Sequence, residues 1–339
     1  MPRETARGAI TLKDVAMLAG VSRSAVSRTF TVGASVSDKT RAKVEKAAAA
    51  LGYSPNALAS SLTTGRTKMI GLVSNNFHNP IFLEVFDLFT KGLQARGLRP
   101  LLVNLTDEVS PENSIRMLRA YSVDGVIVAS STLPASFAEG FRDAGVPVVH
   151  SFGRHAMRPK VNVLGIDNIA AGRMAAQTLI DRGYARVAFL GGPATATSTQ
   201  DRFAGFQEVI AGSDLALSVS YASNYSFDAG RAEMLRLLET TSPAEAYFCG
   251  DDVLSIGALS AIQSAGLRVP EDIGIIGLND MEMAGWANIN LTTIHNPFKQ
   301  IIAASIDLIA ASLNNDSRAP EARLFDCTIV ERGTLRRLP

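Results

Sequence analysis

Hydrophobic residues follow two different periods along the chain, and the change falls near Met69. Between Leu12 and Leu51 the apolar positions recur every three or four residues, which is typical of short amphipathic helices. After Met69, short apolar runs alternate with longer amphipathic helical patterns. The pattern predicts a small all-α head followed by a larger α/β region with parallel sheets.

Capping residues divide the head into three helices. The first is expected to start at Thr11, with an acidic residue three positions later, and to end at Gly20. Ser22 can cap a second helix that runs to about Phe30. A third is expected over 37–51, ended by Gly52. The first two helices, joined by an Ala-Gly-Val-Ser turn, predict a helix-turn-helix, whose second helix can lie in the major groove of DNA.

The second helix has one apolar and one polar face. Val21 and Val26 face inward with part of Ala25, and the polar side carries Arg23, Ser24, Ser27 and Arg28. Arginine pairs bidentately with guanine, and hydroxyls bind phosphates or base edges. The polar face therefore indicates a DNA-reading surface, although in an isolated helix it would more often be only a solvated face.

The charge distribution supports the nucleic-acid hypothesis. Residues 1–69 carry 11 Lys and Arg against 4 Asp and Glu, a net charge of +7, and the other 270 residues carry 22 against 28, a net charge of −6. A basic head on an acidic body is expected where one end meets a polyanion and the other does not.

Composition sets outer limits on the class of protein. The 339 residues are 47% hydrophobic and 19% charged, which excludes wholesale disorder. The chain has no run of 18 apolar residues, so we expect no membrane span, and its first residues lack the apolar core of a secretory signal. Two cysteines are too few for a disulfide framework, so we expect a cytoplasmic protein.

The region after Met69 predicts two three-layer subdomains. Alternating strands and helices form parallel sheets covered on both faces, with ligands at the carboxyl ends of the strands. The expected helices include 80–96, 168–182 and 251–265. The expected strands are 69–74, 98–104, 125–129, 146–150, 161–166, 187–191, 246–250 and 273–278.

The segments 12–28 and 53–68, with motifs further along, closely resemble the lac repressor (LacI/GalR) family of bacterial transcription regulators. The resemblance covers the chain from Thr11 to about Gly333. It implies a DNA-binding head over 1–54, a hinge helix and linker over 55–68, and an effector-binding and dimerisation domain over 69–339. In the family, paired hinge helices enter the minor groove and a leucine wedges between base pairs. The matching residue is Leu62. With Ser22 and the polar face above, the predicted DNA site includes Asn56, Ala59 and Leu62.

The resemblance also implies a type I periplasmic-binding-protein fold for the body. One lobe would comprise about 69–163 and 294–321, and the other about 164–293 and 322–339. Crossovers near residues 163, 293 and 322 would let the two lobes hinge about a cleft. Neither the effector nor the direction of its effect follows from the sequence.

The predicted effector site consists of residues that lie just after strands. Aspartate, asparagine and arginine beside aromatic rings can bind vicinal hydroxyls and cover the apolar face of a sugar. Alternatively, Asp167 and Asp251 merely cap the helices that follow them, and Phe82 is a core residue. Where the family usually has Asn-Asp and Asp-Asp, this chain has Asp251-Asp252 and Asn279-Asp280. The predicted effector residues are Phe82, Ser151, Phe152, Asp167, Arg202, Asp251 and Asn279.

The sequence contains no recognisable catalytic or metal-binding motif. Nucleophile-elbow, phosphate-loop and dinucleotide motifs are missing, and the four histidines lack ligand spacing, so we expect no enzyme, cofactor or metal. The prediction is a homodimeric regulator that binds operator DNA and a sugar, polyol or sugar acid, with a nucleobase-like ligand as the alternative. A solute-binding protein would lack the basic head, and a sugar-modifying enzyme would need catalytic residues.

Overall fold

The chain divides into two compact units, each of which is described by itself. The boundary coincides with the predicted change of hydrophobic period near Met69. The two units are Met1–Thr67 and Lys68–Pro339. The computed structural model describes residues 10–31, 33–54, 61, 65–105, 111–239, 243–314 and 319–338.

The first unit contains the three predicted helices, packed around a small apolar core. Arg41 of the third helix donates a hydrogen bond to the Thr29 carbonyl oxygen at 2.9 Å, which ties it to the second. The helices are α1 (Leu12–Ala19), α2 (Arg23–Thr29) and α3 (Asp38–Leu51). The core consists of Val15, Ala16, Val26, Val44, Ala47 and Ala48.

Local capping explains why the helices begin and end where they do. The Ser22 hydroxyl accepts from the Ala25 amide at 3.2 Å, and Gly20 and Gly52 adopt the left-handed conformation that closes α1 and α3. At Thr11 the expected start of α1 is confirmed, and Thr11 forms a capping box with Asp14. The hydroxyl and the amide of Thr11 both donate to the Asp14 carboxylate, at 2.7 and 2.8 Å.

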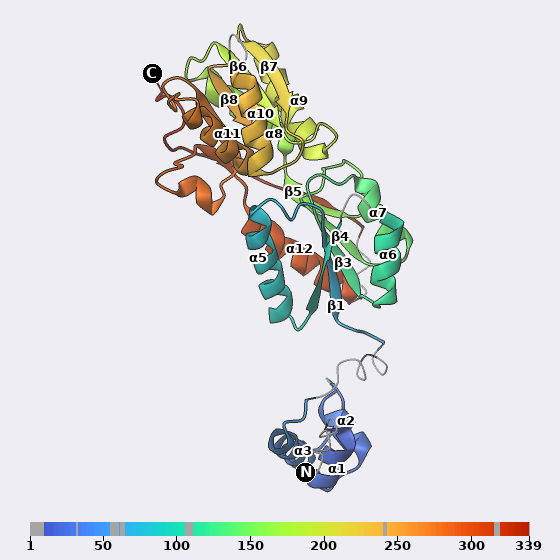
Figure 1. Ribbon diagram of the computed structural model, residues 1–339. Coiled ribbons are helices and arrows are strands. Elements are labelled where there is room, and N and C mark those ends of the chain that lie inside the picture. The colour runs from blue at the N-terminus through green and yellow to red at the C-terminus, as the bar shows by residue number, and fades with distance from the viewer. Residues whose placement is uncertain are drawn as a thin grey trace. The chain divides into compact units, whose positions relative to one another are not determined.

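The second unit comprises two lobes, each built on a six-stranded sheet (Figure 1). In lobe one the sheet order is β11-β5-β4-β3-β1-β2, with all neighbouring strands parallel. Its strands are β1 (Met69–Ser74), β2 (Arg99–Asn104), β3 (Gly125–Ala129), β4 (Val148–Ser151), β5 (Asn162–Ile166) and β11 (Ala322–Phe325).

Lobe two repeats the arrangement, with an antiparallel strand at one edge. The order is β12-β10-β9-β8-β6-β7, and β12 runs antiparallel to β10. Its strands are β6 (Arg186–Gly191), β7 (Ala216–Tyr221), β8 (Ala246–Cys249), β9 (Gly274–Asn279), β10 (Thr293–His295) and β12 (Thr328–Val330). Strands β7, β10, β11 and β12 were not among those predicted.

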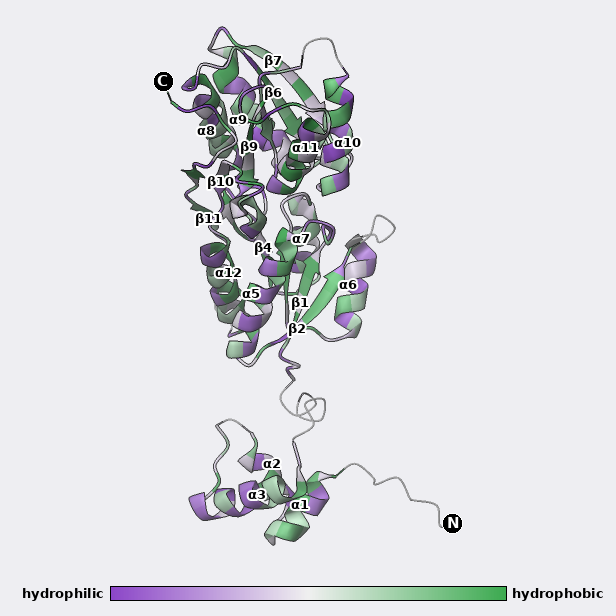
Figure 2. Ribbon diagram, turned by 60° about the vertical axis from the view of Figure 1, so that its left-hand side comes forward, coloured by the Kyte–Doolittle hydropathy of each residue, from purple (hydrophilic) through white to green (hydrophobic). Residues whose placement is uncertain are grey.

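Helices cover both faces of each sheet, because central strands such as β3 and β8 are hydrophobic and buried along their whole length (Figure 2). In lobe one, α5 and α12 pack on one face and α6 and α7 on the other; in lobe two, α8 pairs with α9, and α10 with α11. The helices are α5 (Ile81–Ala95), α6 (Pro111–Ala120), α7 (Ala135–Asp143), α8 (Asn168–Ile180), α9 (Thr197–Ala211), α10 (Phe227–Leu238), α11 (Asp252–Ser264) and α12 (Phe298–Leu313), with a short 3-10 helix, η1 (Glu282–Gly285).

The chain crosses between the lobes three times, a few residues later than expected at each point. Strand β5 pairs with β11 as far as its last residue, Ile166, and β10 pairs with β9 as far as His295, so neither strand is cut at 163 or 293. Strand β11 pairs with β5 and therefore belongs to lobe one rather than lobe two. The crossovers follow Ile166, His295 and Phe325, because each strand completes its ladder before the chain leaves the sheet.

A search of the described helices for a membrane-spanning segment found none that is both long and apolar enough.

Candidate functional site

Helix α2 presents a continuous polar surface in the first unit. Arg23, Ser24, Ser27 and Arg28 are exposed, whereas Val26 and Thr29 on the opposite side are buried. Ser22 is also exposed, but its hydroxyl caps the helix and pairs with the Ser24 hydroxyl at 2.9 Å. Two guanidinium groups and several hydroxyls thus share one face of a helix held by α1 and α3. The other predicted DNA contacts, Asn56, Ala59 and Leu62, lie outside the described residues.

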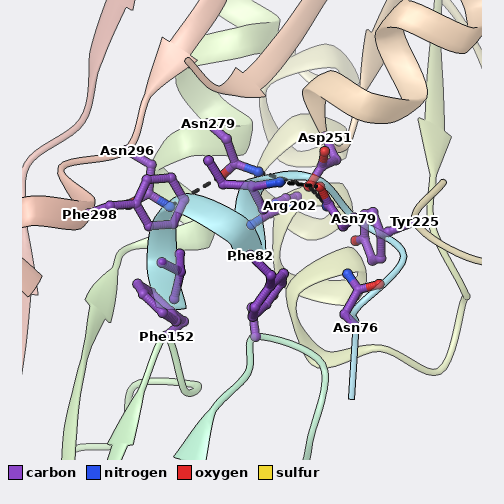
Figure 3. A pocket seen from close by; sticks show the side chains of 13 residues that line it. Asn76, Asn79, Phe82, Phe152, Arg202, Tyr225, Asp251, Asn279, Asn296 and Phe298 are labelled. Atoms are coloured by element: carbon purple, nitrogen blue, oxygen red, sulfur yellow. Dashed lines mark hydrogen bonds between the residues drawn. The ribbon is translucent and has the colours of Figure 1, made fainter. Parts of the chain in front are cut away.

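The second unit contains a pocket between its two lobes, at the carboxyl ends of the strands (Figure 3). It encloses about 420 Å³, counting the part open to solvent. Polar groups and aromatic rings share its lining, which consists of Asn76, Asn79, Ile81, Phe82, Val85, Ser131, Phe152, Arg202, Tyr225, Asp251, Asn279, Asn296 and Phe298.

Five of the seven predicted effector residues line this pocket, and two do not. Phe82, Phe152, Arg202, Asp251 and Asn279 converge on it from both lobes (Figure 3). Ser151 is fully buried, and its hydroxyl donates to the Ser305 hydroxyl of α12 at 2.7 Å. Asp167 accepts from the Ala170 amide at 2.9 Å and caps α8, which was its alternative interpretation.

Arg202 reaches the pocket because α8 and α9 cross at backbone contact. A Cβ on Gly172 would lie 2.1 Å from the Arg202 carbonyl oxygen, and one on Gly205 would lie 1.9 Å from the Ile169 carbonyl oxygen, so only glycine fits at either position. This close crossing lets the Arg202 Nε donate to the Asn168 Oδ1 at 2.8 Å. Its Nη1 donates to the Gly250 carbonyl oxygen, so the buried guanidinium is oriented before any ligand arrives.

Asp251 joins the two lobes through its carboxylate. Its Oδ1 accepts from the Val253 amide at 2.8 Å, which caps α11. Its Oδ2 accepts from the side-chain amides of Asn79 in lobe one, at 3.0 Å, and Asn279 in lobe two, at 2.8 Å. The carboxylate is therefore satisfied by protein donors, and it both caps a helix and faces the cleft.

Burial shifts the acid strength of the two neighbouring carboxyls. Desolvation raises the pKa of Asp251 to about 6, although hydrogen bonds from Val253 and the charge of Arg202 oppose the rise. Desolvation also raises the pKa of Asp252 to about 7, and the nearby carboxylates Asp251 and Asp280 act in the same direction. Perturbed carboxyls beside a cleft are typical of functional sites, and also of buried structural networks.

Further contacts hold the lobes together at the rim of the cleft. Arg154, which follows β4, binds the Asp201 carboxylate of α9 with two hydrogen bonds of 2.8 and 2.5 Å. The Ser131 carbonyl oxygen accepts from the Thr197 hydroxyl at 3.0 Å and from the Ser198 amide at 3.2 Å. With the Asn79–Asp251 bond, these contacts bring lobe one against the amino end of α9 and the cap of α11.

The sequence analysis missed most of the other lining residues. Asn76, Asn79 and Ser131 lie in segments that follow predicted strands, so strand ends could have identified them. Tyr225 and Asn296 follow β7 and β10, which were not predicted. Two lining residues, Phe152 and Asn279, have positive φ angles of 67° and 126°. Such conformations cost about 1–3 kcal/mol each and cluster at functional sites.

No group of three His, Cys, Asp or Glu side chains in the described part of the chain is arranged to hold a metal ion.

Two family descriptions match the chain, one for each unit. Residues 11–56 match "Bacterial regulatory proteins, lacI family", and residues 176–335 match "Periplasmic binding protein-like domain". The transcriptional regulator CelR of Thermobifida fusca is 30% identical over 332 residues, covering 95% of this chain and 97% of the relative. The fold and the site therefore define a ligand-binding, DNA-binding regulator, and the chain belongs to the lacI family of bacterial regulatory proteins.

Solved structures support the same assignment. The lac repressor dimer bound to operator and the anti-inducer ONPF has a TM-score of 0.85 at 25% identity, covering 96% of this chain and 98% of that one. A CelR–cellobiose complex has a TM-score of 0.71 at 29% identity, covering 96% and 99%. The chain is a transcriptional regulator with an effector-binding domain, and its relatives are not enzymes.

Proposed function

We propose that the protein is a repressor that binds operator DNA as a homodimer and whose affinity is set by a small carbohydrate-like effector in the cleft. The observation that carries the proposal is the pocket between the lobes, where Arg202 and Asp251 lie opposite aromatic rings. We place its action in the cytoplasm, where operator DNA and metabolites are both accessible.

The DNA-binding part of the proposal rests on α2. Its exposed Arg23 and Arg28 provide the two guanidinium groups that would pair with guanine edges in the major groove, at about 1–3 kcal/mol per good pair. A single short helix reads only half of an operator. Two heads, one helical turn apart, would read a pseudo-palindrome, which is why we propose a homodimer.

The effector part of the proposal rests on the balance of rings and polar groups. Phe152 and Phe298 meet edge to face with centroids 5.4 Å apart, and Phe82 and Tyr225 also line the pocket. Rings cover the apolar face of a sugar, while amides and a guanidinium bind its hydroxyls. A sugar, polyol or sugar acid fits this lining, and the bound cellobiose of the CelR structure is of the same class.

A nucleobase-like effector is the second candidate. The rings of Phe82, Phe152, Tyr225 and Phe298, which line the pocket, favour stacking of a planar ligand. Aromatic pairing contributes about 0.5–1.5 kcal/mol beyond the area that is buried.

We infer that the effector acts through the angle between the lobes. A ligand that changes the contacts Asn79–Asp251 and Arg154–Asp201 would change the separation of the two hinge segments in a dimer. A coupling free energy of about 1–3 kcal/mol would shift operator affinity about 5- to 150-fold.

The effector assignment is tested by a thermal-shift panel on the full chain. The probes are D-glucose, D-ribose, cellobiose, xylitol, D-gluconate and adenosine. A compound at 100 times its Kd stabilises the body by about 2.7 kcal/mol, and Arg202→Ala should abolish the shift while Arg173→Ala, an exposed residue of α8, should retain it. A variant Arg202→Ala that responds like the wild type would contradict the pocket assignment.

The DNA assignment is tested by operator binding measured as fluorescence anisotropy. Leu62→Ala should weaken specific binding and leave effector binding unchanged, because a wedge leucine would act on the DNA and not on the effector. Leu338→Ala, an exposed position of the second unit, is the control. Equal loss of DNA and effector binding in Leu62→Ala would show that the hinge assignment is wrong.

A further inference from the structure

One buried hydrogen-bond acceptor in the cleft has no partner in the described part of the chain. Asn296 follows β10 and is 5% exposed, and its Oδ1 makes no hydrogen bond. Of the four side-chain atoms in this condition among the described residues, only this one belongs to a residue that lines the pocket. Buried polar atoms are nearly always paired, so an unpaired one at a binding site points to a missing partner.

The orientation of the Asn296 amide follows from the charge on Asp251. A carboxylate only accepts, so Asn279 must turn its Nδ2 toward Asp251, at 2.8 Å. The Asn279 Oδ1 then faces Asn296, whose Nδ2 donates to it at 3.2 Å. The Asn296 Oδ1 is left as the free end of the chain of bonds (Figure 3).

The direction of these hydrogen bonds is fixed, because other contacts hold the Asp251 carboxylate in place. Its Oδ1 accepts from the Val253 amide, and its Oδ2 also accepts from Asn79. Asn79 in turn is fixed by the Ile81 amide, which donates to its Oδ1 at 3.2 Å. A reversal of the Asn296 amide would therefore place its Oδ1 against the Oδ1 of Asn279, and two acceptors would face each other.

We propose that Asn296 is a specificity-determining residue of the cleft, and that its Oδ1 accepts a hydrogen bond from a hydroxyl or N–H group of the effector. This inference rests on the proposed function, and it narrows the effector class. A neutral polyhydroxy compound can donate to Asn296 and accept from Arg202 at the same time. A carboxylate or phosphate, which only accepts, has no place beside Asn296.

The first experiment needs no ligand and measures urea unfolding of the full chain. In Asn296→Leu the unpaired Oδ1 is lost, while the Oδ1 of Asn279 becomes unpaired, so the two changes offset each other and the midpoint should stay within error of the wild type. The matched variant Asn79→Leu removes a buried amide with both bonds made, and its midpoint should fall. Equal losses in the two variants would overturn the inference.

The second experiment measures binding of the panel compounds to the same variants. For any compound that the wild type binds, the dissociation constant should rise about 5- to 150-fold in Asn296→Leu. Asn296→Ser keeps a hydroxyl that can accept from the ligand, and it should recover part of that loss. Binding by Asn296→Leu within twofold of the wild type would refute the role of Asn296. A panel without any wild-type ligand would instead refute the proposed effector class.

Discussion

Replacing Asp252 by asparagine should remove the pH dependence of stability that its buried carboxyl gives the second unit. Asp252 is the first residue of α11 and is fully buried. Its Oδ2 accepts from the Met281 amide at 2.8 Å, and its Oδ1 accepts from the Thr293 hydroxyl at 2.5 Å. Asparagine has the same shape and can accept from Met281. Its amide can donate to Thr293, because a hydroxyl can reverse its role.

The magnitude follows from the difference in pKa between the folded and the unfolded chain. Burial raises the pKa of Asp252 from the ordinary 3.8 to about 7. The folded state therefore binds the proton more tightly, and its stability falls as the pH rises from about 4 through 7. At 1.36 kcal/mol per pH unit the whole loss is about 4 kcal/mol, and more than half of it falls between pH 5 and pH 8.

The assay is urea unfolding at pH 5, 6, 7 and 8, followed by circular dichroism and by the fluorescence of Trp286, the single tryptophan of the chain. Between pH 5 and pH 8, Asp252→Asn should gain about 2–3 kcal/mol of unfolding free energy relative to the wild type. The contribution of the neighbouring Asp251 is present in both proteins and largely cancels in the comparison. A difference that is constant with pH, or that moves in the opposite direction, would refute the reasoning.

Three further outcomes are expected. Gly205→Ala should lower the free energy of unfolding by about 3 kcal/mol, because the new methyl group meets the backbone of α8. A loss below about 1 kcal/mol, measured by thermal unfolding, would contradict the close crossing of α8 and α9. Arg154→Met should lower the free energy of unfolding by less than about 1 kcal/mol, since the ion pair of Arg154 with Asp201 is partly exposed. Small-angle X-ray scattering should nevertheless show a more open second unit. An unchanged radius of gyration would contradict the role of this pair in holding the lobes together. The chain has Ser60 and Thr63 where the family often has basic residues, so the log–log salt slope of operator binding should be shallower than the value of about −10 for lac repressor, and an equally steep slope would be the contrary result.

The head was predictable from the sequence because its signals are local. Ser22 caps α2, and Gly20 and Gly52 end α1 and α3 where the pattern placed those ends. The strands that were missed depend on their neighbours instead. Strand β7 is a half-exposed edge strand, and β10 and β12 have only three residues each, so none has a hydrophobic run long enough to stand out.

The effector pocket was only partly predictable, because strand ends do not fix where side chains point. Ser151 ends β4 but turns toward Ser305 of α12, whereas the next residue, Phe152, adopts a positive φ and enters the pocket. Asn296 stands on a crossover between the lobes, in a segment without a periodic pattern. The pairing of β10 with β9 brings Asn296 beside Asn279. The unpaired Oδ1 of Asn296 can be recognised only from this contact in the folded chain.

The three crossovers also determine the order in which the two units can complete their folding during synthesis on the ribosome. The sheet of lobe one lacks β11 until residue 325 has been made, and the sheet of lobe two lacks β12 until residue 330. The helices of the head, by contrast, lie within the contiguous segment 12–51, and Gly52 and Tyr53 complete their cap and core, so they need nothing from the second unit. Since domains generally fold as units during synthesis, the DNA-binding unit of a nascent chain would be folded before the effector-binding unit is complete.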